Sequence, residues 1–165
     1  PALRSACFLN GGLFPGAYRP LLIQKLLLSP LGPLVARGID KRRFARSLRT
    51  IFGPATPPGP ELIDGFWELV TCNDGTAVLP GIMRYISERE RFADRWVGAL
   101  RETTAPLKLI DGAADPISGA HMAESYREVV ADADVTLLPA IGHYPQLEAP
   151  QAVLAAYREF RLKIG

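Results

Sequence analysis

The chain has 165 residues, of which 48% are apolar and 22% are charged, and its net charge is +2. This length suits about one domain with a buried core, and the composition excludes a disordered chain. The small net charge is unlike that of a dedicated nucleic-acid binder, and no apolar run approaches the roughly 20 residues of a membrane span. Two cysteines make neither a disulfide framework nor a metal site.

The chain starts with an apolar segment, residues 3–9, which is typical of a strand covered on both faces. It ends at the turn signal Asn10-Gly11-Gly12. Residue 1 is Pro, and no signal peptide follows, so a cytoplasmic location is the default expectation. Because no element precedes this strand, we expect the chain to start in the middle of a larger fold. We assign residues 1–19 to a core strand and its loop.

Residues 20–102 carry apolar side chains at helical spacing, which predicts a helical domain. Within it, Asp40 is placed to cap a helix with apolar residues on one face and arginines on another. Asn73-Asp74-Gly75 predicts a turn. Ser87 and Glu90 have the spacing of a capping box, so we expect a helix to start there.

The end of the chain alternates strands with helices. Residues 107–110 and 135–138 are predicted strands, while residues 120–130 and the segment from Pro150 are predicted helices. This order predicts a parallel α/β arrangement, and we assign residues 103–165 to a C-terminal core.

Two loops that follow these strands carry an acid and a histidine. Asp111 and Asp115 follow the first strand, and His143 follows the second. The carboxyl ends of neighbouring parallel strands meet at one edge of a sheet, so we expect these side chains to lie close together. A lone Asp is most often a turn residue, but a carboxylate beside an imidazole orients it as a general base.

The motifs in these loops resemble a known fold. Gly112-Ala113-Ala114-Asp115-Pro116, together with residues 142–150, resembles the C-terminal end of the α/β-hydrolase fold, and the helical region resembles its cap domain. Further segments are similar to mesoderm-specific transcript-like proteins, within the haloalkane dehalogenase and epoxide hydrolase branch. These segments are residues 10–15, 18–20, 73–75, 95–100 and 143–148.

The resemblance implies the C-terminal portion of an α/β-hydrolase fold, with short parallel strands and a helical cap. It implies that Asp115 is the charge-orienting acid and His143 the catalytic base. Asp111 lies outside the motif and is a weaker candidate, while Glu148 is expected to be a structural hydrogen-bonding residue or a helix-start charge. The implied reaction is hydrolysis of a small apolar ester, epoxide or haloalkane, without a cofactor or metal.

In this fold the nucleophile precedes the acid and the histidine. No serine before Asp115 lies in a Gly-x-Ser-x-Gly pattern. We therefore expect the nucleophile to be absent from this chain, and the chain alone to be inactive. The resemblance leaves two nucleophiles open, an Asp in the dehalogenase and epoxide hydrolase branch and a Ser in the esterase branch.

Aromatic residues of the helical region are candidates for substrate binding. Trp67 and Tyr85 could line an apolar pocket, although helical spacing more often reports packing between helices. Residues 37–49 contain six basic residues and one acid, which predicts either a solvated helix face or a non-catalytic module that binds a partner or a membrane surface. A three-stranded remnant would also expose a sheet edge, so self-association is a further expectation.

Overall fold

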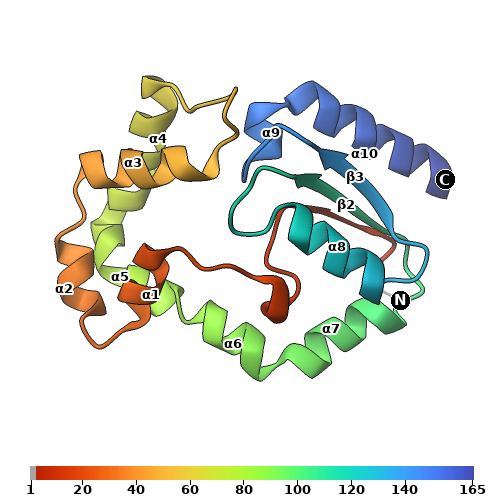
Figure 1. Ribbon diagram of the computed structural model, residues 1–165, viewed down its shortest axis with the longest axis horizontal. Coiled ribbons are helices and arrows are strands. Elements are labelled where there is room, and N and C mark those ends of the chain that lie inside the picture. Colours follow the sequence, from red (N-terminus) through yellow and green to blue (C-terminus); the bar gives the residue numbers. More distant parts are fainter. Residues whose placement is uncertain (1–2) are drawn as a thin grey trace.

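A parallel sheet of three strands organises one half of the molecule (Figure 1). The computed structural model describes residues 3–165, so residues 1 and 2 of the predicted core segment lie outside the described residues. The strands stand in the order β1 (Ala6–Leu9), β2 (Leu107–Gly112) and β3 (Asp134–Leu138), with β2 in the centre. The predicted parallel α/β arrangement is therefore confirmed.

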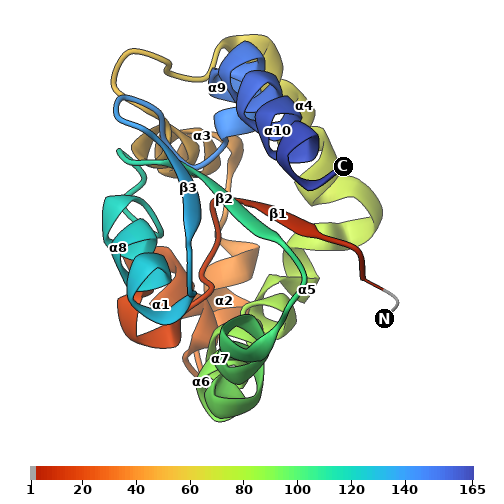
Figure 2. The ribbon, with the colours of Figure 1, turned by 90° about the vertical axis from the view of Figure 1, so that its right-hand side faces the viewer.

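Helices cover both faces of this sheet. Helix α8 (Ala120–Val129) packs on one face, and α10 (Pro150–Ile164) lies on the other, preceded by the single turn α9 (Pro145–Glu148) (Figure 2). Helix α8 makes the crossover that two adjacent parallel strands require. Leu109 of β2 is fully buried against Met122 and Tyr126 of α8, because both faces of the central strand are covered.

The chain between β1 and β2 is helical, and we call its seven α-helices the cap helices. They are α1 (Leu22–Leu28), α2 (Gly32–Arg37), α3 (Lys41–Ile51), α4 (Pro60–Thr71), α5 (Gly75–Ile82), α6 (Tyr85–Arg91) and α7 (Ala93–Glu102). Helices α1 to α5 gather beside the sheet, and α6 and α7 lead the chain back toward it (Figure 1). Two 3₁₀ turns, Pro15–Ala17 and Cys72–Asp74, complete this region.

Helix α3 forms as its sequence predicts. The Asp40 carboxylate accepts a hydrogen bond of 2.8 Å from the Arg43 backbone N–H, which satisfies a donor at the helix start. Leu48 and Ile51 are buried in one apolar cluster with Ile63 of α4, while Arg42, Arg46 and Arg49 are exposed. The predicted turn between α4 and α5 is also confirmed, since Asn73 and Asp74 both adopt left-handed backbone angles.

Three local predictions need correction. The first strand is shorter than residues 3–9, since β1 begins at Ala6, where pairing to Leu107 of β2 starts. Helix α6 starts at Tyr85, so Ser87 and Glu90 lie inside the helix and form no capping box. The helical conformation has begun before Ser87, because Arg84 already has helical backbone angles. An N-cap residue is typically extended, so a residue inside the helix cannot act as one. Strand β2 also continues two residues further than predicted, so that Asp111 pairs with Leu137 instead of lying in a turn.

The outer strands of the sheet are β1 and β3. Self-association through such an edge stays a prediction, as do the domain bounds assigned from the sequence. Within residues 3–165, every helix is too short or too polar to traverse a bilayer.

Candidate active site

The carboxylate of Asp115 is buried just beyond the end of β2 and is held by several donors. Its side chain is fully shielded from solvent, and it accepts hydrogen bonds from the Ile117 N–H at 2.9 Å and from the Ser118 N–H at 3.0 Å. The Ser118 hydroxyl donates a further bond of 2.8 Å. Burial by itself would raise the pKa of Asp115, but the hydrogen bond and charge of His143 and these donors lower it below its usual value.

His143 lies beside this carboxylate, on the loop that follows β3. The distance between its Nδ1 and the Asp115 Oδ2 is 2.7 Å. An ionised carboxylate only accepts hydrogen bonds, so Nδ1 carries the hydrogen and Nε2 is the nitrogen available for proton transfer. The expected proximity of Asp115 and His143 is thus confirmed.

The histidine loop is fixed from its backbone as well as from its ring. The His143 N–H donates to the carbonyl oxygen of Ile51, the last residue of α3, at 2.7 Å. The imidazole also meets the Tyr144 ring edge-on, with 5.0 Å between ring centroids. These contacts hold His143 between the sheet and the cap helices. A general base needs such a fixed position, because it must lie within hydrogen-bond reach of the proton that it takes.

Glu148 is the structural hydrogen-bonding residue that the sequence predicts. Its Oε2 accepts bonds from the backbone N–H groups of Gly53 and Gly142 at 2.7 and 2.9 Å, and from the Thr56 hydroxyl at 2.6 Å. Its Oε1 accepts a bond of 3.1 Å from the Tyr144 N–H. One carboxylate therefore fastens the histidine loop to the segment that follows α3.

Asn10 is a site residue that the sequence analysis treats only as part of a turn. Its side-chain oxygen accepts a 2.8 Å bond from the Gly112 N–H, and its amide nitrogen donates a 3.1 Å bond to Asp115 Oδ2. Asn10, the residue after β1, has a positive φ of 35°. The available signal was its position at the carboxyl end of the strand next to β2.

Asp111 is buried but takes no part in the Asp115–His143 pair. Its side chain is fully inaccessible, and within the described residues neither of its oxygens has a hydrogen-bond partner. Burial, followed by the negative charge of Asp115, raises the pKa of Asp111 to about 7.

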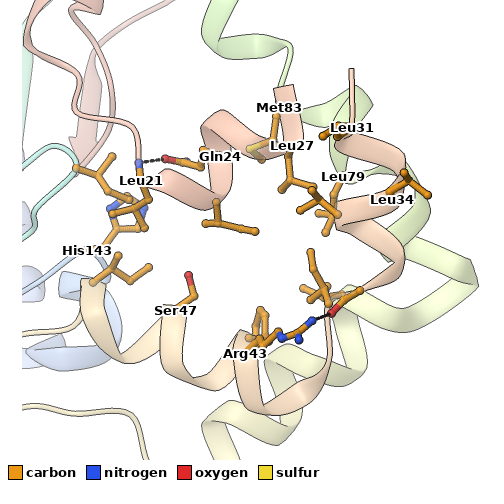
Figure 3. Close-up of a pocket in the computed structure, with 18 of the residues that line it drawn as sticks. Leu21, Gln24, Leu27, Leu31, Leu34, Arg43, Ser47, Leu79, Met83 and His143 are labelled. Atoms are coloured by element: carbon orange, nitrogen blue, oxygen red, sulfur yellow. Dashed lines mark hydrogen bonds between the residues drawn. The ribbon is translucent and has the colours of Figure 1, made fainter. Parts of the chain in front are cut away.

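His143 faces a cavity of about 710 Å³ between the sheet half and the cap helices (Figure 3). Helices α1, α2 and α5 supply mostly aliphatic walls, and α3 runs along one side. The walls include Leu27, Leu31, Leu34, Leu79 and Met83. This volume lies in the range of small-molecule sites, and an apolar wall with a few polar groups is typical of them.

The two aromatic residues predicted to bind substrate lie outside the lining of this cavity. The Trp67 ring packs against Phe44 at 5.5 Å between centroids. The Tyr85 hydroxyl forms a 2.9 Å hydrogen bond with that of Tyr18, and the Arg89 guanidinium lies 4.7 Å from the Tyr85 ring centroid. Their role in substrate binding stays a prediction. Within residues 3–165 no cluster of His, Cys, Asp or Glu side chains is arranged to hold a metal ion.

Comparison with known proteins relates this geometry to a fold. The Cif epoxide hydrolase of Acinetobacter nosocomialis superposes with a TM-score of 0.76 and 19% identity, over 96% of this chain and 53% of that one. The chain has the fold of the C-terminal portion of an α/β hydrolase. A haloalkane dehalogenase variant from Bradyrhizobium elkanii shares this fold, with a TM-score of 0.71 and 14% identity over 98% of this chain and 60% of that one.

Two proteins of similar sequence cover most of this chain. The human mesoderm-specific transcript homolog protein is 40% identical over 96% of this chain and 48% of its own length. LipZ of Mycobacterium tuberculosis, which is named as a hydrolase, is 40% identical over 93% of this chain and 54% of its own length. The chain thus spans about half the length of these relatives. No family model matches the sequence.

Proposed function

We propose that this chain supplies the acid, the base and the substrate cavity of a hydrolase that works through a covalent intermediate. The 2.7 Å contact between His143 Nδ1 and Asp115 Oδ2, at the end of an apolar cavity, supports this proposal most directly. The name of LipZ and the epoxide hydrolase and dehalogenase of like fold support it further.

The nucleophile in this proposal comes from protein outside these 165 residues. A carboxylate nucleophile attacks a substrate carbon and forms an ester. A halide leaves as its anion, whereas an epoxide ring opens to an alkoxide, which takes a proton from water. His143 Nε2 then takes a proton from water, and the resulting hydroxide attacks the carbonyl carbon of that ester. Asp115 stabilises the imidazolium, which returns its proton as the carboxylate and the alcohol product separate.

A serine nucleophile uses the same two residues. His143 first takes the hydroxyl proton of the serine and gives it to the leaving group, and an acyl-enzyme forms. His143 then takes a proton from water, which attacks the acyl-enzyme, and returns the proton to the serine oxygen as the carboxylic acid product leaves. Both versions suit the aliphatic cavity, so we propose a small, largely apolar ester, epoxide or haloalkane as substrate.

The test joins this chain to the N-terminal half of LipZ and measures hydrolysis of a nitrophenyl ester, a terminal epoxide and a bromoalkane. Asp115→Asn should lower kcat by about 10⁴-fold and His143→Ala by about 10⁶-fold, because a triad loses about these factors without its acid and without its base. His121 is the other histidine of the chain, so His121→Ala is the matched control and should retain activity. Full activity in His143→Ala would refute the base assignment.

A second candidate function is attachment to an anionic membrane surface. The exposed face of α3 carries Arg42, Arg46 and Arg49, and α1 and α2 expose Leu22 and Leu34 nearby in the chain. Basic and apolar groups together are what bind a protein to an anionic bilayer surface. Co-sedimentation with phosphatidylserine vesicles should weaken when the three arginines become glutamine. Vesicle binding that is absent, or unchanged in that variant, would exclude this candidate.

A further inference from the structure

Helix α3 runs along the cavity and turns one row of side chains toward it. Arg43, Ser47 and Ile51 are four residues apart, so they lie on the same side of the helix, and all three line the cavity. His143 is fastened to the far end of this row, because its N–H donates to the Ile51 carbonyl. Arg43 stands at the opposite end of the row (Figure 3).

The length of this row sets a distance. Eight residues separate Arg43 from Ile51, which is about 12 Å along the axis of an α-helix. An extended chain advances about 1.2 Å per bond, since three backbone bonds of a peptide span about 3.6 Å. A linear molecule of about ten bonds therefore reaches from the histidine end to the arginine end.

Arg43 is the one residue with a permanently charged side chain among those that line the cavity in the described part of the chain. One of its terminal nitrogens donates to the Gly38 carbonyl, and its Nε lies 3.7 Å from Asp40 Oδ2. A guanidinium has five N–H donors in a planar fork, so these contacts leave donors free for a bound anion. Asp40 already caps the helix with its other oxygen, so it neutralises Arg43 only in part.

The walls between the two ends favour an aliphatic chain. They are built mostly from leucine, isoleucine, valine and methionine side chains, with Gln24 and Phe44 among them, and Ser47 lies midway along the row. A chain of methylene groups gains from burial against such walls, at roughly 0.8 kcal/mol for each buried group.

We propose that the cavity accepts a linear substrate with its hydrolysable group at His143 and an anionic group at Arg43, separated by an aliphatic chain of about ten bonds. This inference rests on the proposed function for the identity of the reacting end. Arg43 acts in it as a specificity residue, since it contacts the part of the substrate remote from the reaction.

Binding to this chain tests the anion site without any need for turnover. The probes are the monomethyl ester of decanedioic acid and its matching amide, in which a neutral carboxamide replaces the carboxylate. Calorimetric titration should show that Arg43→Met weakens binding of the monoester by about three- to fivefold, as expected of an exposed ion pair. Binding of the amide should stay within about twofold, because it carries no charge for the guanidinium to attract.

Matched controls separate this site from general attraction by a basic surface. Arg42→Met removes the same charge from a neighbouring residue that does not line the cavity, and it should leave both affinities unchanged. Arg43→Lys should retain part of the preference, which guards against misfolding of the methionine variant. The monomethyl ester of hexanedioic acid is too short to span both ends and should respond little to Arg43→Met.

Three results would overturn the inference. They are an equal loss for monoester and amide in Arg43→Met, an equal loss in Arg42→Met and Arg43→Met, or a full response from the short monoester. Hydrolysis assays on the fusion of this chain with the N-terminal half of LipZ distinguish failure of the anion site from failure of the proposed function. Ester hydrolysis that is indifferent to Arg43 overturns the anion site alone, whereas Arg43-dependent binding without hydrolysis of any ester overturns the reaction and leaves the anion site.

Discussion

The carboxylate of Glu148 accepts a 2.7 Å hydrogen bond from the backbone N–H of Gly53, although the two residues are 95 positions apart in the chain. This bond joins the segment that follows α3 to the single turn after the histidine loop. The same carboxylate accepts the N–H groups of Gly142 and Tyr144, on either side of His143. The position of the base relative to the cap helices therefore depends on this side chain, which is not itself placed to react, together with the His143 N–H bond to Ile51.

Glu148→Ala should lower the free energy of unfolding by about 1–3 kcal/mol, because several partly buried donors lose their acceptor. Urea denaturation followed by circular dichroism measures this loss. Gln146→Ala, at an exposed position of the same turn, is the matched control and should change stability by less than about 0.5 kcal/mol. Equal effects of the two substitutions would contradict the bracing role of Glu148.

Asn10→Gly should lower stability by about 1–2 kcal/mol, because Gly112 loses an acceptor and Asp115 loses a donor. Glycine tolerates the positive φ at this position, so the loss reports the side chain alone. Asn10→Ala should cost about 1 kcal/mol more, since alanine is strained in that conformation. Urea denaturation of both variants gives the comparison, and a glycine variant as stable as the parent would contradict it.

Asp111 should make stability fall as the pH rises. Its pKa is raised to about 7 in the folded chain, so the folded state binds more protons than the unfolded state between about pH 4 and pH 7. The contribution of the neutral Asp111 carboxyl to stability is complete below the pKa of Asp111 in the unfolded chain. It is lost as the pH rises through about 7, its pKa in the folded chain. Asp111→Asn should accordingly raise stability by about 1–3 kcal/mol at pH 9 and have little effect at pH 4.

Chemical denaturation at the two pH values measures the effect of Asp111→Asn. Asp132→Asn, which changes an exposed acid in the same way, is the control and should show no such pH dependence. A parallel response of the two variants at pH 9 would show that net charge, not the buried carboxyl, controls the effect.

Lys108 and Asp134 form a contact of 2.5 Å that is buried on one side only, because Lys108 is 2% exposed and Asp134 is 26% exposed. Asp134→Asn leaves a buried ammonium without its carboxylate and should cost about 2–4 kcal/mol. Lys108→Met should cost less than about 1 kcal/mol, since Asp134 keeps solvent and Lys163 at 3.8 Å. Thermal unfolding of both variants checks the asymmetry, and equal losses would contradict it.

The acid–base pair could be predicted because its signals are local. Each of the two strands and the loop that follows it lies within one short stretch of sequence, and parallel strands bring consecutive carboxyl ends together. This rule places both Asp111 and Asp115 near His143, and the resemblance to the α/β-hydrolase fold singled out Asp115. The extent of β2 was predicted less well, since Asp111 and Gly112 are common turn residues that here are held by pairing to β3. The predicted capping box at Ser87 and Glu90 was wrong, because the backbone is already helical at Arg84 and α6 starts at Tyr85.

By itself, the sequence determined the strand and helix order from residue periodicity, the cap of α3 by Asp40 from the preference for Asp at helix starts, and the meeting of the two site loops from the rule for adjacent parallel strands. The choice of Asp115 over Asp111 as the partner of His143 came from the resemblance to the α/β-hydrolase fold. Only the tertiary structure decided that Asn10 holds the acid loop and that Glu148 holds the histidine loop. It also decided that Arg43 lines the cavity while its neighbour Arg42 does not. These contacts join segments far apart in the chain, and their partners are fixed only when the cap helices pack against the end of the sheet.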